Sequence, residues 1–124
     1  MKVYNLEYKF SVVEEVEGEA LTSTRGYLNY LRSAFDDLPM QEQVWVLCLN
    51  VHHVPVCRRR ITIGVVDCVQ FHMRELYAPA LSPNVNASYI VVAHNHPSGS
   101  TVPSDADYKA TEAFKKAGQA IGVP

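Results

Sequence analysis

Two histidines two residues apart, followed by an aspartate, form the part of this sequence best suited to chemistry. His94 and His96 follow the apolar run 88–93, and Asp107 comes after a turn rich in Pro, Gly and Ser. On an extended chain, residues i and i+2 point to the same face, so both imidazoles can reach one ion without distorting the backbone. Two His and one carboxylate, with a fourth position left to water, make up the ligand set of a catalytic zinc site.

The same segment has a structural interpretation. The run Ser104-Asp-Ala-Asp107 is also typical of a helix N-cap with an acidic residue three positions later, which needs no metal. A His-x-His pair alone is a weak signal for a metal site. Ser104 can cap the helix while Asp107 faces an ion, so both interpretations stay open.

The segment resembles a known family. The run His94-Asn-His-Pro-Ser-Gly99, then Pro103-Ser104 and Asp107, is similar to the signature His-x-His-Pro-Ser-Gly…Pro-Ser-x-x-Asp of the RadC-like branch of the JAB/MPN (JAMM) zinc metallohydrolases. Residues 64–77 resemble that branch's segment Gly-Thr-x-x-Ser-x-x-x-His-Pro-Arg-Glu-x-[Phe/Tyr], and residues 42–50 resemble its first core strand. The resemblance implies an α/β (α+β) fold, JAB/MPN-like and cytidine-deaminase-like, with a mixed β-sheet flanked by helices.

The resemblance also implies an activity. Members of this kind are zinc-dependent metallopeptidases or isopeptidases, so the expected substrate is an amide bond in a peptide or an isopeptide-linked protein. The residues that would hold Zn²⁺ are His94, His96 and Asp107. Glu42 would be the catalytic general base and then the general acid, because zinc-activated water needs a carboxylate to move its proton. Ser104 would be the catalytic oxyanion stabiliser, unless its hydroxyl serves only as a cap.

Glu42 has a rival, Glu75. Judged from the residues alone, Glu42 at the entrance of the apolar run 44–49 could be a surface carboxylate. Glu75 falls on the first turn of an expected helix, where acidic side chains are common for electrostatic reasons. We therefore favour Glu42 as the base.

Three features depart from the family pattern. Cys68 stands where the branch has Ser, and Met73 stands where it has Pro. A thiol is a weaker hydrogen-bond donor and could even ligate zinc, although we favour an inert Cys68. Family members continue past the last helix with a further strand and an Asp-His pair, so we expect a C-terminally truncated domain. The strand edge left exposed could pair two chains into a homodimer.

Composition and charge weigh against other functions. The chain of 124 residues is 48% hydrophobic and 19% charged, which is typical of a soluble globular protein. A formal net charge of −2 gives no bulk attraction to nucleic acid, so a DNA repair-associated or mobile-element accessory role has weak support. The run Arg58–Arg60 is the exception, and such runs are usually a solvated rim. A non-catalytic MPN scaffold is the other alternative, but the intact ligand set argues against it.

The remaining signals concern location and organisation. No signal peptide and no run of membrane-spanning length is visible, and three cysteines without Cys-x-x-Cys spacing favour a cytoplasmic protein without structural disulfides or a membrane partner. We expect an N-terminal strand and helix extension over residues 1–38, with an edge strand in 2–16 and a helix that ends before Pro39. The RadC-like JAB/MPN domain is expected to occupy residues 39–124.

Within that domain we expect a strand over 44–49 and a hairpin with two exposed turn histidines, His52 and His53. A return strand over 55–60 should follow, and then a further strand or bulge over 61–64. A helix over 71–81 should be kinked or ended by Pro79. A strand over 88–93 and a helix from residue 104 follow. That last helix should end at one of the glycines near the C-terminus, Gly118 or Gly122.

Overall fold

The computed structural model describes the chain except for residues 8, 12–18, 38–39, 65–72, 97–101 and 104. The elements in chain order are α1 (Thr24–Leu31), the 3₁₀ helix η1 (Arg32–Phe35), β1 (Glu42–Leu49), β2 (Pro55–Gly64), α2 (Met73–Leu81), β3 (Tyr89–His94) and α3 (Asp105–Ile121). The sheet has the order β2-β1-β3, and β1 is antiparallel to both neighbours. The predicted α+β class with flanking helices is confirmed. A mixed sheet was expected, and both strand pairs in the described part of the chain are antiparallel.

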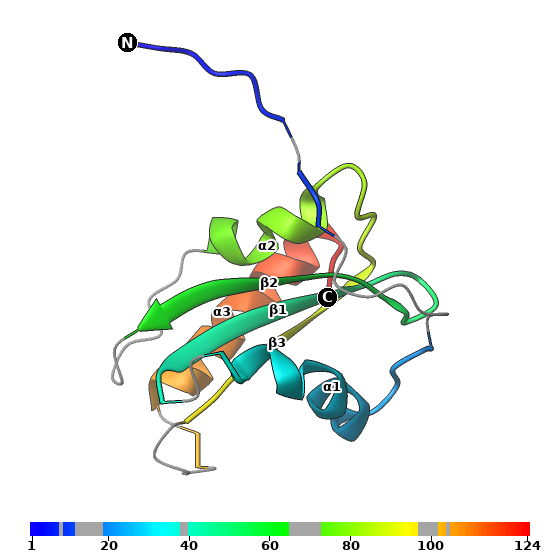
Figure 1. Cartoon of the computed structure of the whole chain (residues 1–124), viewed down its shortest axis with the longest axis vertical. Coiled ribbons are helices and arrows are strands. Elements are labelled where there is room, and N and C mark those ends of the chain that lie inside the picture. The colour runs from blue at the N-terminus through cyan, green and yellow to red at the C-terminus, as the bar shows by residue number, and fades with distance from the viewer. Residues whose placement is uncertain (8, 12–18, 38–39, 65–72, 97–101, 104) are drawn as a thin grey trace.

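The central strand β1 is covered on both faces, as its nearly continuous apolar run predicts. Because side chains alternate along a strand, Val46 and Cys48 face one helix layer while Leu47 and Leu49 face the other. Figure 1 shows the three layers, with α1 on one side of the sheet and α2 with α3 on the other. Whether a side chain of β1 or β3 meets α1, or instead α2 and α3, therefore depends on the face of the sheet that it occupies.

Helix α1 covers one face of the sheet, and its first residue follows Ser23. The Ser23 hydroxyl accepts a hydrogen bond from the Gly26 N–H at 3.0 Å, which caps the helix. Leu31 is buried against Leu47 and Leu49, and the helical segment ends with η1 at Phe35, before Pro39. The helix is therefore part of the packed body of the molecule.

Helices α2 and α3 cover the other face. Their contact includes a hydrogen bond of 2.8 Å from the Tyr77 hydroxyl to the Phe114 carbonyl. Helix α2 ends at Leu81, as the expected span 71–81 predicts, with Pro79 buried two residues before its end. Helix α3 ends at Gly122, whose φ of 74° is the left-handed conformation that favours glycine.

The hairpin between β1 and β2 forms where it was expected, at residues 50–54. The Asn50 side-chain oxygen accepts hydrogen bonds from the N–H groups of His52 and Val54 at 2.9 and 3.0 Å. His52 is exposed, but the expectation that His53 is exposed is wrong. Its ring stacks on Tyr89 at 4.5 Å, because the positive φ of 60° turns this side chain back onto the sheet.

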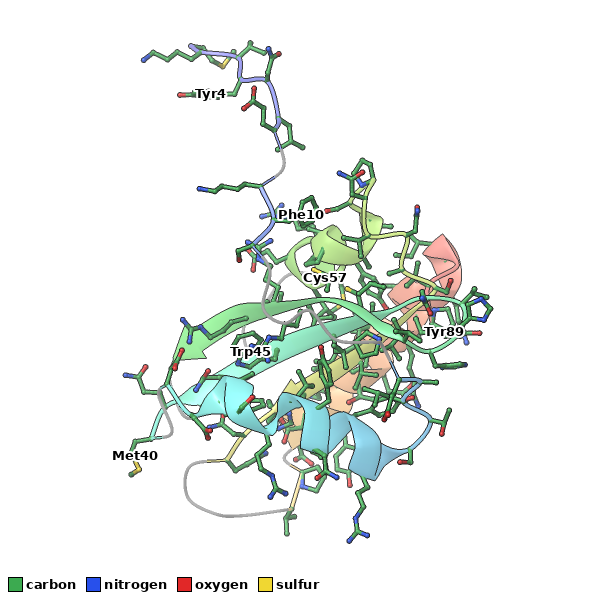
Figure 2. All side chains as sticks on the ribbon, turned by 45° about the vertical axis from the view of Figure 1, so that its right-hand side comes forward. Tyr4, Phe10, Met40, Trp45, Cys57 and Tyr89 are labelled. Atoms are coloured by element: carbon green, nitrogen blue, oxygen red, sulfur yellow. The ribbon has the colours of Figure 1, made fainter. Side chains whose placement is uncertain are left out.

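The N-terminal segment differs from expectation. In its described residues, 1–7 and 9–11, the structure contains no strand, so the edge strand expected over 2–16 is wrong there. Val3, Tyr4 and Leu6 are exposed because no sheet edge lies alongside them, and Figure 2 shows Tyr4 on a segment that leads away from the body. No helix in the described part of the chain is long and apolar enough to cross a membrane.

Candidate metal centre

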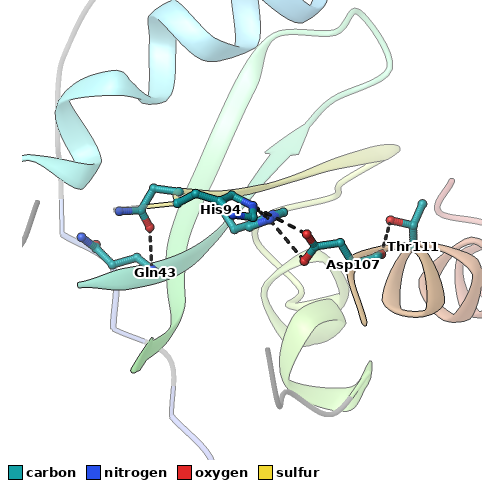
Figure 3. Close-up of polar contacts among 6 residues, drawn as sticks. Gln43, His94, Asp107 and Thr111 are labelled. Atoms are coloured by element: carbon teal, nitrogen blue, oxygen red, sulfur yellow. Dashed lines mark hydrogen bonds and ion pairs between the residues drawn. The ribbon is translucent and has the colours of Figure 1, made fainter. Parts of the chain in front are cut away.

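The two histidines and the aspartate come together on the face of the sheet that carries α3. His94 is the last residue of β3, His96 lies two residues further, and Asp107 is on the first turn of α3. Residue Val44 of β1 pairs with His94 in the sheet, and the face they share is the one packed against α2 and α3. The strand thus presents both imidazoles to the start of the helix, as the i and i+2 spacing predicts (Figure 3).

The distances are those of three side chains that converge on one point. The His94 Nε2 lies 3.3 Å from one carboxylate oxygen of Asp107, and the His96 Nε2 lies 3.6 Å from the other. The two Nε2 atoms are 2.7 Å apart. The aspartate side chain is only 9% exposed, against 29% and 27% for the histidines, so the carboxylate forms the floor of the site and the imidazoles form its open side.

These residues fit a tetrahedral metal ion. Zinc–ligand bonds of about 2.0–2.1 Å place two tetrahedral ligand atoms roughly 3.3 Å apart. The two N–O distances, 3.3 and 3.6 Å to different oxygens of the carboxylate, are close to that separation. The two imidazole nitrogens, 2.7 Å apart, need to separate by about 0.6 Å. In the described part of the chain this is the one group of three His, Cys, Asp or Glu side chains whose ligand atoms lie within 4.8 Å of one another.

Glu42 lies on the strand that pairs with β3, the strand that leads to both histidines. It is the first residue of β1 and is only 9% exposed. The register that pairs Val44 with His94 places Glu42, two residues earlier, across from His96 when it is continued. Residues at i and i+2 share a face, so the Glu42 carboxylate lies on the same side of the sheet as both imidazoles.

Asn95, between the two histidines, holds the backbone on both sides of Glu42. Its side-chain oxygen accepts a hydrogen bond from the Gln43 N–H at 2.6 Å, and its side-chain nitrogen donates to the Gln41 carbonyl at 2.9 Å. The Asn95 N–H also donates to the Gln43 carbonyl at 3.4 Å. One amide side chain therefore fixes the two peptide groups that flank Glu42, and it ties them to the strand that carries the histidines.

Comparison with known proteins now gives the family. The family model described as "RadC-like JAB domain" matches residues 21–124. This chain belongs to the RadC-like JAB family. The match begins before α1, so the helix that packs on the sheet lies inside the matched region of this RadC-like JAB domain.

Curated relatives of this RadC-like JAB domain carry the name UPF0758 protein. The protein of Chlorobium phaeovibrioides is 31% identical over 118 residues, which cover 95% of this chain and 49% of that protein. The Staphylococcus haemolyticus protein is 34% identical over 103 residues, 83% of this chain and 44% of that protein. The protein of Picosynechococcus sp. is 36% identical over 84 residues, 68% and 34% of the two chains. The chain thus spans between a third and a half of the length of these relatives.

The other residues singled out in the sequence have the following places in the RadC-like JAB domain. Glu75 lies on the exposed first turn of α2, as predicted. Ser104 and Cys68 lie outside the described residues. Arg58 and Arg60 place their guanidinium carbons 5.6 and 5.8 Å from the centroid of the Trp45 ring, so these arginines pack on an aromatic face.

Reasoning from sequence missed Asn95 and Gln43. Gln43 is fully buried, donates from its side-chain nitrogen to the Phe35 carbonyl at 3.2 Å and accepts from the Trp45 indole N–H at 3.0 Å. A glutamine inside an apolar strand was the available signal, because buried amides need partners. For Asn95 the available signal was its place between His94 and His96, because an amide side chain there can both donate and accept a hydrogen bond.

Proposed function

We propose that this RadC-like JAB domain is a zinc-dependent hydrolase that cleaves an amide bond in a peptide or an isopeptide-linked protein. The observation that carries the proposal is the convergence of His94, His96 and Asp107 within 4.8 Å, beside the buried Glu42. Imidazole and carboxylate ligands with one position left open are typical of catalytic zinc sites. Family membership supports the same class of chemistry.

His94, His96 and Asp107 would hold the metal ion. Zn²⁺, when bound, supplies a Lewis acid that activates water and polarises a carbonyl. The Asp107 carboxylate is the least exposed of the three proposed ligands, and the Thr111 hydroxyl donates to the main-chain carbonyl of Asp107 at 2.8 Å near the start of α3. The more exposed histidines leave the site open on the side where a substrate can enter.

Glu42 moves the proton in this proposal. Its carboxylate accepts a proton from the attacking water and delivers that proton to the amine that leaves when the amide bond breaks. The hydrogen bonds from Asn95 to the backbone on either side of Glu42 keep this carboxylate on the histidine face. Ser104 remains the predicted oxyanion stabiliser and lies outside the described residues.

Metal content is the first test. Purified protein should contain about one zinc per chain, and His96→Ala should lose it, because two ligands hold zinc far more weakly than three. His52→Ala is the matched control, since this histidine lies in the exposed hairpin turn. Wild-type protein that stays free of zinc after incubation with the metal would contradict the site.

Activity is the second test. On a panel of peptide and isopeptide substrates, Glu42→Gln should lower the turnover rate by about 10²–10⁴-fold, the usual contribution of a general base. Zinc content should stay unchanged, because Glu42 is not among the proposed ligands. Glu75→Gln is the control and should retain activity. Loss of activity in Glu75→Gln with retention in Glu42→Gln would reverse the assignment of the base.

A further inference from the structure

Two cysteines face each other across the hairpin, away from the metal centre. Cys48 of β1 and Cys57 of β2 are register partners in the antiparallel pair. Cys48 lies roughly 13 Å along β1 from Val44, the residue that pairs with His94, at a strand rise of about 3.3 Å per residue. The proposed hydrolase does not use this pair.

Both side chains point to the same face of the sheet. Cys48 is a fully buried member of the cluster beneath α2, and Cys57 packs against that cluster while remaining partly exposed. Figure 2 shows Cys57 on β2, close to the side of the sheet that α2 covers. Directly opposite residues in an antiparallel pair have Cα atoms about 4.5–5.5 Å apart, which falls within the range of about 4.4–6.8 Å spanned by disulfides.

We infer that Cys48 and Cys57 form a reactive dithiol, a modification site at which a low-molecular-weight disulfide oxidises the chain to an intramolecular Cys48–Cys57 disulfide. The partly exposed Cys57 is the residue that an oxidant reaches first. The buried Cys48 is the residue that resolves the mixed disulfide. The product would join β1 covalently to β2.

The contact between the two thiols supports these roles. A hydrogen bond from the Cys48 thiol lowers the pKa of Cys57 to about 7 against the opposing effect of burial, and the charge of Arg59 acts in the same direction as the hydrogen bond. The same hydrogen bond, followed by burial, raises the pKa of Cys48. The thiolate is the nucleophile in thiol–disulfide exchange, so Cys57 attacks and Cys48 follows.

Oxidation by glutathione disulfide takes place in two thiol–disulfide exchange steps. The Cys57 thiolate attacks one sulfur of glutathione disulfide, a Cys57–glutathione bond forms, and one glutathione thiolate leaves. The Cys48 thiol then attacks the Cys57 sulfur, and its proton passes to the departing glutathione sulfur, so that the second glutathione leaves as a thiol. Two cysteine thiols are oxidised, and the oxidant disulfide is reduced to two thiols.

Intact mass measurement tests the proposal on the full chain. In a Cys68→Ser background, glutathione disulfide should remove the mass of two hydrogens, leave no stable glutathione adduct, and yield a peptide cross-linked through Cys48 and Cys57. Cys48→Ala in that background should retain glutathione on Cys57. Cys57→Ser should gain neither modification. A stable adduct on Cys57 while Cys48 is present, or two thiols that stay reduced, would overturn the proposal.

A second measurement requires no change in the core. The rate at which iodoacetamide alkylates Cys57 should rise with pH and reach half of its maximum near pH 7, because the lowered pKa places the thiolate there. A midpoint near the ordinary thiol value of about 8.5 would show that the two sulfurs are not in contact. That result would overturn the proposal even if the core variant failed to fold.

Discussion

The two ends of β1 differ in what they bury. At the end of the strand, Leu47 and Leu49 are enclosed by apolar side chains from α1 and β3. At its start, Glu42 and Gln43 are the buried polar residues of the described chain, and each lies next to the end of β3. We call the start of the strand, with Glu42 and Gln43, its polar half, and the end, with Leu47 and Leu49, its apolar half.

The difference shows where this fold can place chemistry. Burial of apolar side chains stabilises the folded state roughly in proportion to the area removed from water, and it does not require particular bonding directions. A buried polar group stabilises only when its hydrogen bonds are complete, and the Gln43 amide meets this condition through Phe35 and Trp45. The apolar half holds the sheet in register, and the polar half uses that register to bring Glu42 across from the histidines.

Leu47→Ala tests the apolar half and should have the largest effect. Leu47 is fully buried between the helix α1 layer and the sheet, so the change should lower the free energy of unfolding by about 2–5 kcal/mol. Urea denaturation measures this loss. The zinc content of the folded protein should not change. Leu28→Ala, at a position 55% exposed on α1, is the control and should be close to neutral.

Gln43→Ala tests the polar half. The change leaves the part-buried Phe35 carbonyl and Trp45 indole N–H without their partner, which should cost about 1–3 kcal/mol in total because water can reach both groups in part. Thermal or urea unfolding should show a loss of this order, with zinc binding retained. Gln41→Ala, at the exposed position two residues earlier, provides the matched comparison. Equal stability of the two variants would mean that the buried amide does no more than a surface one.

Asn95→Ala should have the smallest effect on stability and the most selective effect on function. Loss of its two side-chain hydrogen bonds should cost about 0.5–1.5 kcal/mol each. Because these bonds hold the backbone beside Glu42, amide hydrolysis should fall while zinc content stays near that of the wild type. Asn95→Asp keeps the acceptor for the Gln43 N–H and should lose less stability. Joint loss of zinc and activity would place Asn95 with the ligands instead.

The structure could be predicted from the sequence where a local pattern of residues favours one conformation. The period of two in the His-x-His run predicted a shared face, and the structure brings His94, His96 and Asp107 together. The turn at Asn50 and the left-handed Gly122 follow equally from local chemistry. Such signals depend on residues close together in the chain.

Where sequence reasoning failed, the deciding contacts were distant. His53 was expected to be exposed, but Tyr89 supplies a ring to stack on. The role of Asn95 depends on strand pairing between residues 52 positions apart, which no local pattern contains.

That separation has a consequence for how the domain folds. The three proposed ligands lie within residues 94–107, so one short segment can capture a metal ion before the sheet is complete. Glu42 joins them only when β3 docks on β1, after a long loop has closed, and contacts of high sequence separation form late and slowly. The hairpin of β1 and β2, by contrast, closes over a few residues. We therefore expect metal capture to precede catalytic competence along the folding pathway.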